Sequence, residues 1–165
     1  MLVPDLKIEE QYKKLGKALS GEDDLGMVVW AHIIIEHELE EFVRLAAPEP
    51  SQLKFSEMDY SAKVKLALVL GLNSDLKPAL NAAGSLRNNF SHRLEMKIGE
   101  QEAKNLFATL TPNHLKALRG FYPIIFENKG GAKFQDASAR DRVQMFFVMI
   151  FSHLFVERHS LEDEG

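Results

Sequence analysis

The sequence predicts an all-α protein, folded as a single compact bundle of about six or seven helices. Apolar residues recur at helical spacing along most of the 165-residue chain, and no stretch of any length alternates like a strand. Hydrophobic residues make up 45% and charged residues 27% of the chain, which is ordinary for a globular protein. A chain of this length is most simply one domain with a sizeable core.

Two helices are predicted in the N-terminal part. The first runs from about Pro4 to Leu19. The second runs from about Asp24 to Ala47, and the acidic residues 22–24 suit its N-terminus because they interact favourably with the helix dipole. It ends where Pro48 begins a loop.

The predicted apolar side of this second helix, its seam, includes one histidine. The seam residues are spaced by four and three positions, and they are Val28, His32, Ile35, Leu39 and Phe42. We expect His32 to be a hydrogen-bonded core residue. Together with Glu36 and Glu40 it forms a column along the helix. A metal site would need further ligands from another element, and nothing in the sequence nominates them.

Two helices are predicted in the middle of the chain. The first, from about Tyr60 to Leu72, is apolar around most of its surface, so we expect it to be central to the core. The next carries residues 79–92, with Asp75 as its N-cap and Pro78 in its first turn. Gly84 within it suggests a close approach to another helix.

The C-terminal part predicts three more helices. One covers about Glu100 to Leu110, and the next begins at Thr111-Pro112 and is interrupted by Pro123. The last, from about Ser138 to Arg158, has no polar residue between Met145 and Phe151. We interpret that stretch as core, with a dimer contact as the alternative. It is too short to span a membrane.

The segment Leu86–Arg93, at the end of the fourth predicted helix, gathers hydrogen-bonding and titratable groups. Arg87 and Ser91 are four residues apart, as are Asn88 and His92, so each pair lies along one edge of the helix. Asn88 is placed to orient a ring nitrogen of His92, while Arg87 supplies a permanent cation beside a group that titrates near neutral pH. This pattern suits binding of a phosphate or carboxylate beside a proton carrier. The alternative is an ordinary helix end whose polar residues interact with the dipole.

Two further residues are candidates for orienting these groups. Glu36 is an acidic residue that we expect to hold Arg87 or His92, and Ser91 is the neighbouring hydroxyl. The acidic run 36–41 fits a solvated helix face equally well.

An Arg followed at once by a polar residue, then by His after four intervening residues, resembles the signature of HEPN domains. These are small helical domains, many of which cut or process RNA. Residues 31–42 and 60–72, in this order before the Arg-Asn segment, are similar to proteins of the mannitol-operon-repressor (MltR) type. The resemblance covers about residues 25–98, with a weaker echo at 138–143. It implies a HEPN-like core at about 24–98, on which C-terminal helices within 99–159 pack.

The resemblance implies two alternative functions. The first is a metal-independent RNA endonuclease or RNA-binding module, acting as a homodimer whose two Arg–His segments line one cleft. In it, His92 would move the 2′-OH proton or protonate the leaving 5′ oxygen, and Arg87 would stabilise charge on the phosphorane. Asn88 would position His92 or the phosphate. The second is a non-catalytic MltR-type regulatory protein that acts through protein–protein contacts.

Charge and composition exclude several other classes. The net charge of −4 argues against a broad nucleic-acid-coating surface. Direct DNA binding is not expected, since the sequence has no basic recognition helix. The absence of cysteine rules out disulfides, thiolate metal sites and thiol nucleophiles. No cofactor is expected, and the N-terminus lacks the form of a signal peptide, so we expect a cytoplasmic protein without membrane attachment.

Overall fold

The computed structural model describes residues 6–93, 96–127 and 133–164, and within these ranges it forms seven α-helices and no strand. The all-α prediction is therefore confirmed. The helices are α1 (Leu6–Ser20), α2 (Asp24–Ala46), α3 (Tyr60–Val69), α4 (Lys77–Ser91), α5 (Glu100–Phe107), α6 (Pro112–Ile125) and α7 (Ala139–Glu164). Short 3-10 turns are η1 (Pro50–Gln52), η2 (Phe55–Glu57), η3 (Ser74–Leu76) and η5 (Phe134–Asp136). The expected helix start at Pro4 lies outside the described residues.

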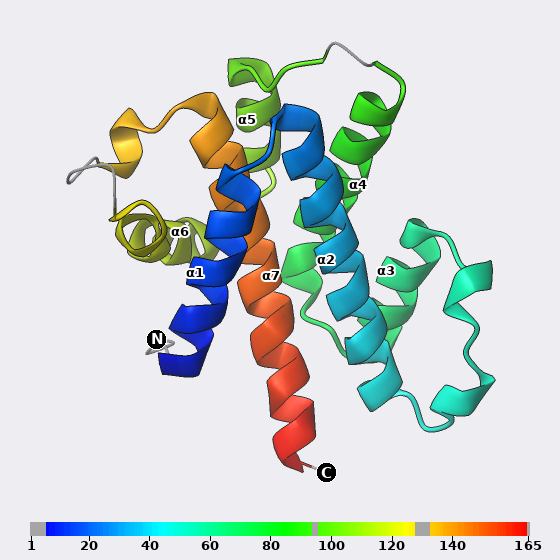
Figure 1. The fold of residues 1–165 in the computed structure, drawn as a ribbon. Helices are drawn as coiled ribbons and strands as arrows, with labels where there is room; N and C mark the ends of the chain where they lie inside the picture. Colours follow the sequence, from blue (N-terminus) through cyan, green and yellow to red (C-terminus); the bar gives the residue numbers. More distant parts are fainter. Residues whose placement is uncertain (1–5, 94–95, 128–132, 165) are drawn as a thin grey trace.

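Helix α7 runs through the middle of the bundle and packs against α1, α2, α5 and α6 (Figure 1). Every residue from Val143 to Ser152 is buried, so the prediction that the apolar stretch of this helix is core is confirmed. Gln144 is buried among them, and its amide donates hydrogen bonds of 2.9 Å to the Gly16 carbonyl oxygen and to Ser20 Oγ. These bonds tie the last helix to the first. Among the described helices, none has both the length and the apolar character that crossing a membrane requires.

Helix α2 begins at Asp24 as the sequence predicts, because Asp23 caps it. The Asp23 carboxylate accepts a hydrogen bond of 2.7 Å from the Gly26 backbone N–H. All five seam residues of this helix are buried, and they are Val28, His32, Ile35, Leu39 and Phe42. The predicted inward face is therefore confirmed, and it packs mainly on α7 and α3.

The middle of the chain differs from the prediction in two ways. Helix α3 ends at Val69, which is 82% exposed, and only Lys63, Val64 and Ala67 of its ten residues are buried, so α3 is not central to the core. Asp75 does not cap α4: it lies within η3, which Asn73 caps by accepting a hydrogen bond from the Asp75 backbone N–H, and the N-cap residue of α4 is Leu76, which provides no side-chain cap. Pro78 lies in the first turn of α4, as predicted.

Helix α6 continues through Pro123 to Ile125, so the interruption predicted at this proline is wrong. Proline costs a helix one hydrogen bond, but buried neighbours can outweigh that loss. Here Leu118 and Tyr122 are buried on the same helix, while Pro123 itself is exposed. Packing of these buried residues stabilises α6 despite the backbone hydrogen bond that is lost at Pro123.

Gly84 makes the close helix approach that the sequence suggests. A Cβ at this position would lie 2.8 Å from the ring of Tyr60 on α3. That ring packs against His32, and its hydroxyl donates a hydrogen bond of 2.8 Å to the Leu80 carbonyl oxygen. Because the ring is held on both sides, it has little freedom to move away.

We expect Gly84→Ala to lower the free energy of unfolding by about 1–3 kcal/mol, because the methyl group overpacks the contact with Tyr60. Urea unfolding followed by circular dichroism measures this change. Gly120→Ala in α6 is the matched control, since a Cβ there meets nothing within 4 Å. The control should gain about 0.5–1 kcal/mol from helix propensity. Equal effects of both substitutions would contradict the role of the contact.

Candidate functional site

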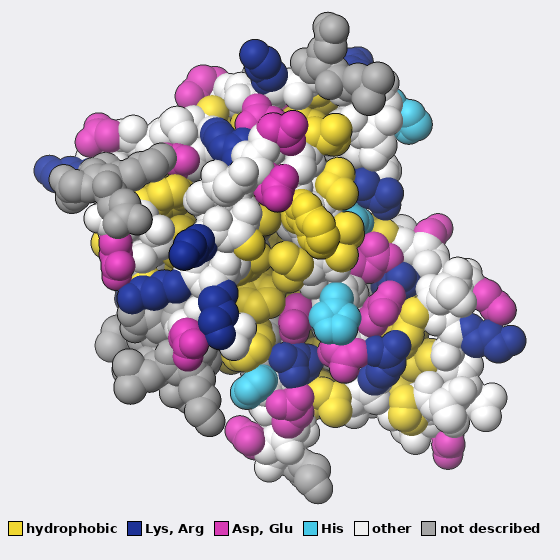
Figure 2. Space-filling view, viewed as in Figure 1, with side chains coloured by type: hydrophobic (Ala, Val, Ile, Leu, Met, Phe, Trp, Pro, Cys, Tyr) yellow, Lys and Arg dark blue, Asp and Glu magenta, His cyan; other side chains and the backbone are white. Residues whose placement is uncertain are grey.

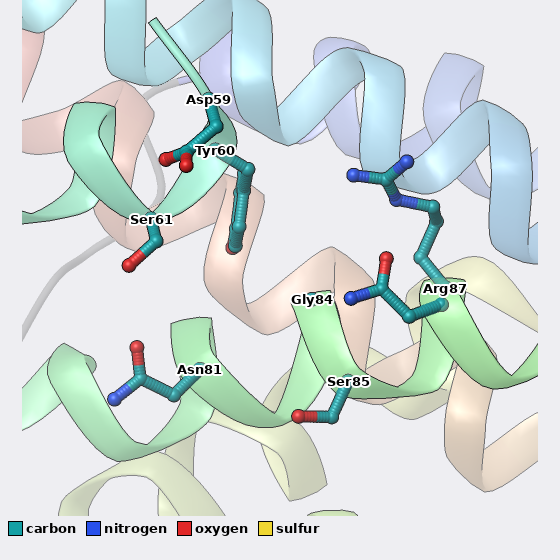
Figure 3. A pocket seen from close by; sticks show the side chains of 8 residues that line it. Asp59, Tyr60, Ser61, Asn81, Gly84, Ser85 and Arg87 are labelled. Atoms are coloured by element: carbon teal, nitrogen blue, oxygen red, sulfur yellow. The ribbon is translucent and has the colours of Figure 1, made fainter.

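A pocket of about 560 Å³ lies between α3 and α4, beside the predicted Arg87 segment (Figure 3). Helix α4 contributes Asn81, Gly84, Ser85, Arg87 and Asn88, and the start of α3 contributes Asp59, Tyr60 and Ser61. The three- and four-residue spacing of the α4 residues places them on one side of that helix. The pocket therefore combines amides, hydroxyls and a guanidinium, with the Asp59 carboxylate at its α3 edge. That carboxylate also caps α3 by accepting from the Ala62 backbone N–H at 2.7 Å.

Arg87 is half-buried and reaches from α4 toward α2 (Figure 3). Its Nε atom is buried and has no hydrogen-bond partner within the described ranges. No carboxylate in the described part of the chain forms an ion pair with this guanidinium. An arginine in this state retains its capacity to bind an anion such as phosphate.

Glu36, which was expected to hold Arg87 or His92, is bound to Lys63 instead. Lys63 of α3 is 6% exposed, and its Nζ donates to Glu36 at 2.5 Å and to Glu40 at 2.6 Å. Burial alone would lower the pKa of Lys63, but hydrogen bonds to both carboxylates outweigh it and raise the pKa above its usual value. The prediction for Glu36 fails because α3 brings a nearer cation to the same side of α2.

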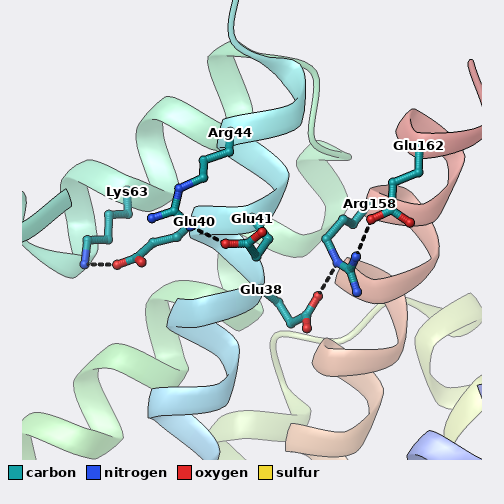
Figure 4. Close-up of polar contacts among 7 residues, drawn as sticks. All are labelled: Glu38, Glu40, Glu41, Arg44, Lys63, Arg158 and Glu162. Carbon is teal, nitrogen blue, oxygen red and sulfur yellow. Dashed lines mark hydrogen bonds and ion pairs between the residues drawn. The ribbon is translucent and has the colours of Figure 1, made fainter. Parts of the chain in front are cut away.

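The rest of the acidic run on α2 is paired as well (Figure 4). Glu38 is buried and accepts a hydrogen bond of 2.8 Å from Arg158 of α7, which also binds Glu162 at 2.6 Å. Glu41 pairs with Arg44 one turn further along α2. The run is therefore not a simple solvated face, because its carboxylates connect α2 to both α3 and α7.

His32 is buried as predicted, with 3% of its surface exposed, but the expected hydrogen bond is missing. Neither ring nitrogen has a hydrogen-bond partner in the described part of the chain. The Glu36 carboxylate lies 3.6 Å from Nε2, which is too long for a hydrogen bond, and the ring packs on Tyr60 with centroids 4.4 Å apart. Burial, together with the Arg87 and Lys63 cations, lowers the pKa of His32 to about 4, although the Glu36 carboxylate opposes this shift. The imidazole is thus neutral at pH 7 and lies within the electrostatic reach of Arg87.

His92 lies apart from the pocket. It is the exposed C-cap residue of α4 and does not line the pocket, whereas Arg87 and Asn88 do. Within the described residues no hydrogen bond joins Asn88 to His92, so the expected orienting contact is not formed. The Ser91 hydroxyl donates at 2.9 Å to the Arg87 backbone carbonyl oxygen, which leaves it bonded to its own helix.

The structure thus brings together two of the predicted residues, Arg87 and Asn88, and adds Tyr60, which was not predicted as a site residue. His32 does not line the pocket and packs against the Tyr60 ring. The position of His32 on the apolar side of α2 predicts that the residue is buried, but it does not predict which side chains surround the imidazole. Over the described ranges, no three His, Asp or Glu side chains are grouped so that they could hold a metal ion.

Comparison of the chain with protein-family models, with curated proteins and with solved structures finds no match. The relation to HEPN and MltR-type proteins therefore stays a prediction, carried by the three sequence segments described above.

Proposed function

We propose that this protein is a HEPN-like domain that binds RNA at the pocket between α3 and α4 and acts as a homodimer. The observation that supports it is Arg87: a half-buried guanidinium at an open pocket, with no carboxylate paired to it among the described residues. A cation held in this way is suited to a backbone phosphate, which Arg contacts with strong charge-assisted hydrogen bonds.

The groups around Arg87 support an RNA ligand over a bare anion. Asn81, Ser85 and Asn88 present exposed amide and hydroxyl groups along the same side of α4. Such groups are suited to hydrogen bonds with the 2′-OH and the base edges of single-stranded RNA. Further along the chain, Arg93 and Lys97 are exposed cations.

Cleavage of the bound RNA is the second part of the proposal. His92 is the proton carrier: its exposed imidazole takes the 2′-OH proton or delivers one to the leaving 5′ oxygen. The 2′ oxygen then bonds to phosphorus as the P–O5′ bond breaks, which leaves a cyclic phosphate and requires no metal. A second copy of the chain would bring its own His92, which is why the proposal includes a homodimer.

The test is RNA binding in EDTA, measured by fluorescence anisotropy with labelled single-stranded RNA. We expect Arg87→Ala to weaken binding by about tenfold, the value of one charge-assisted phosphate contact, and to reduce the dependence of affinity on salt. Arg119→Ala is the matched control, because it removes the same charge from an exposed position on α6. Equal weakening by both variants would show only a general charge effect and would contradict the pocket.

A regulatory protein of the MltR type, acting through protein contacts, is the second candidate. The observation that favours it is an exposed apolar face on α2, where Trp30 is 53% and Ile33 is 49% exposed. Figure 2 shows hydrophobic side chains gathered on this side of the molecule over α2. Absence of RNA binding and intact RNA at high protein concentration would favour this candidate over the first.

A further inference from the structure

The pocket between α3 and α4 is lined by one carboxylate and one guanidinium. Asp59 belongs to the start of α3 and Arg87 to α4, and both line the pocket. In Figure 3 the Tyr60 side chain lies between them. Within the described ranges neither group forms an ion pair, so both charges are available to a ligand. A ligand that contacts both must carry an anionic group at one end and hydrogen-bond donors at the other.

The protein itself uses only part of the Asp59 carboxylate. Its Oδ1 atom accepts a hydrogen bond of 2.7 Å from the Ala62 backbone N–H and so caps α3. A helix cap requires a single accepting oxygen, whereas an ionised carboxylate has two oxygens, each with more than one lone pair. Asp59 is also exposed. It can therefore accept two parallel hydrogen bonds from a ligand while it continues to cap the helix.

One RNA base has the pair of donors that a carboxylate can accept side by side. Guanine presents N1–H and its N2 amino group next to each other on the Watson–Crick edge. Adenine and cytosine place a ring nitrogen with a lone pair beside their amino group, which would face the second carboxylate oxygen. Uracil has a single N–H between two carbonyl oxygens. Since the bases of single-stranded RNA are recognised on these edges, a carboxylate in the pocket favours guanine.

We propose that Asp59 selects guanine, so that the pocket binds a guanine nucleotide with its phosphate on Arg87 and its Watson–Crick edge on Asp59. The proposal rests on the proposed function insofar as both place a phosphate on Arg87. It adds the base and the residue that selects it. The pocket volume of about 560 Å³ is within the range of small-molecule sites. Asn81 and Ser85 line the same pocket and offer an amide and a hydroxyl to the sugar.

The first experiment compares short oligouridine RNAs in which one central residue is guanosine, inosine, adenosine or cytidine. Inosine lacks only the N2 amino group of guanosine, so this pair isolates one of the two proposed hydrogen bonds. By fluorescence anisotropy, we expect the RNA with guanosine to bind about tenfold more tightly than each of the others, which is a usual discrimination for one paired base contact. Calorimetry with guanosine and inosine 5′-monophosphates tests the free nucleotide in the same way.

Asp59→Asn removes the carboxylate but keeps the helix cap, because the side-chain oxygen of asparagine caps helices as well. Its amide has one acceptor and one donor, which do not match the two donors of guanine. We expect the ratio of affinities for the guanosine and inosine RNAs to fall from about tenfold to about one. The ratio is the readout because the loss of a negative charge strengthens binding of every RNA. Asp59→Ser should behave in the same way, since serine also caps helices.

Asp23→Asn is the matched control for the carboxylate. Asp23 is also an exposed N-cap residue, and it accepts a hydrogen bond of 2.7 Å from the Gly26 backbone N–H at the start of α2. It does not line the pocket. This variant changes the net charge equally and should keep the wild-type preference for guanosine.

The outcomes separate this inference from the proposed function. RNA binding that requires Arg87 but does not distinguish guanosine from inosine overturns this inference and leaves the proposed function standing. A guanosine preference that survives Asp59→Asn or Asp59→Ser also overturns it. Selective binding of guanosine 5′-monophosphate without RNA binding supports the inference and overturns RNA as the ligand. No binding of any probe overturns both.

Discussion

Lys63→Met is expected to lower the free energy of unfolding by about 2–4 kcal/mol, measured by urea unfolding at pH 7. Methionine keeps most of the volume of the side chain but leaves Glu36 and Glu40 without their shared cation. These carboxylates are 27% and 21% exposed, so water screens part of the cost and the loss stays below that of a fully buried pair. Removing one partner costs more than the ion pair contributes, because the remaining charges stay in a poorly hydrated place.

Lys65→Met is the control for this change, since Lys65 is an exposed lysine on the same helix. An equal loss of stability in the two variants would contradict the role of the buried pair. The pH dependence offers a second check. The folded-state pKa of Lys63 is raised above 10.5, so its contribution is present below pH 10.5 and is lost as pH rises through the folded-state pKa. The wild type should therefore lose more stability above that pH than Lys63→Met does.

His92→Ala is expected to lower the rate of RNA cleavage by about 10²–10⁴-fold, the usual contribution of one general acid or base. The residue is an exposed helix cap rather than a packing element, so the variant should keep its thermal stability. Single-turnover cleavage of labelled RNA in EDTA, resolved on a denaturing gel, measures the rate and identifies the cyclic phosphate product. RNA binding should change little, because His92 does not line the pocket.

His37→Ala is the control for cleavage, because it removes an exposed imidazole from α2 rather than from α4. Cleavage that persists in His92→Ala, or that disappears when EDTA is added to the wild type, would contradict the proposed chemistry. Binding of RNA without cleavage by the wild type would leave Arg87 as a binding residue and remove the catalytic role of His92.

Local signals in the sequence predicted much of the helical framework. The start of α2 follows from the side chain of Asp23, and the start of α6 follows from Thr111-Pro112, where Thr111 accepts a hydrogen bond from the His114 backbone N–H. The burial of α7 follows from its apolar stretch. Each of these features depends on residues within one or two turns, which is why a single sequence reveals them.

The candidate site could be predicted only in part, because its decisive contacts join different helices. Arg87 and Asn88 were identified as candidates from their spacing, and they do line the pocket. The partner of Glu36 depends on how α3 packs against α2, which places Lys63 rather than Arg87 within hydrogen-bond distance. The surroundings of His32 depend on α2, α3 and α4 together. Periodicity along one helix carries no information about such neighbours.

The central position of α7 has a consequence for how the chain folds as it is synthesised. Helices α1 and α2 pack on α7, yet α3, α4, α5 and α6 must all leave the ribosome before α7 does. Until α7 has been synthesised, the apolar sides of α1 and α2 lack the helix against which they pack. The nascent chain must therefore avoid aggregation while these apolar surfaces are exposed. The bundle can therefore close only after α7 has been synthesised, when Gln144 can form its hydrogen bonds to Gly16 and Ser20.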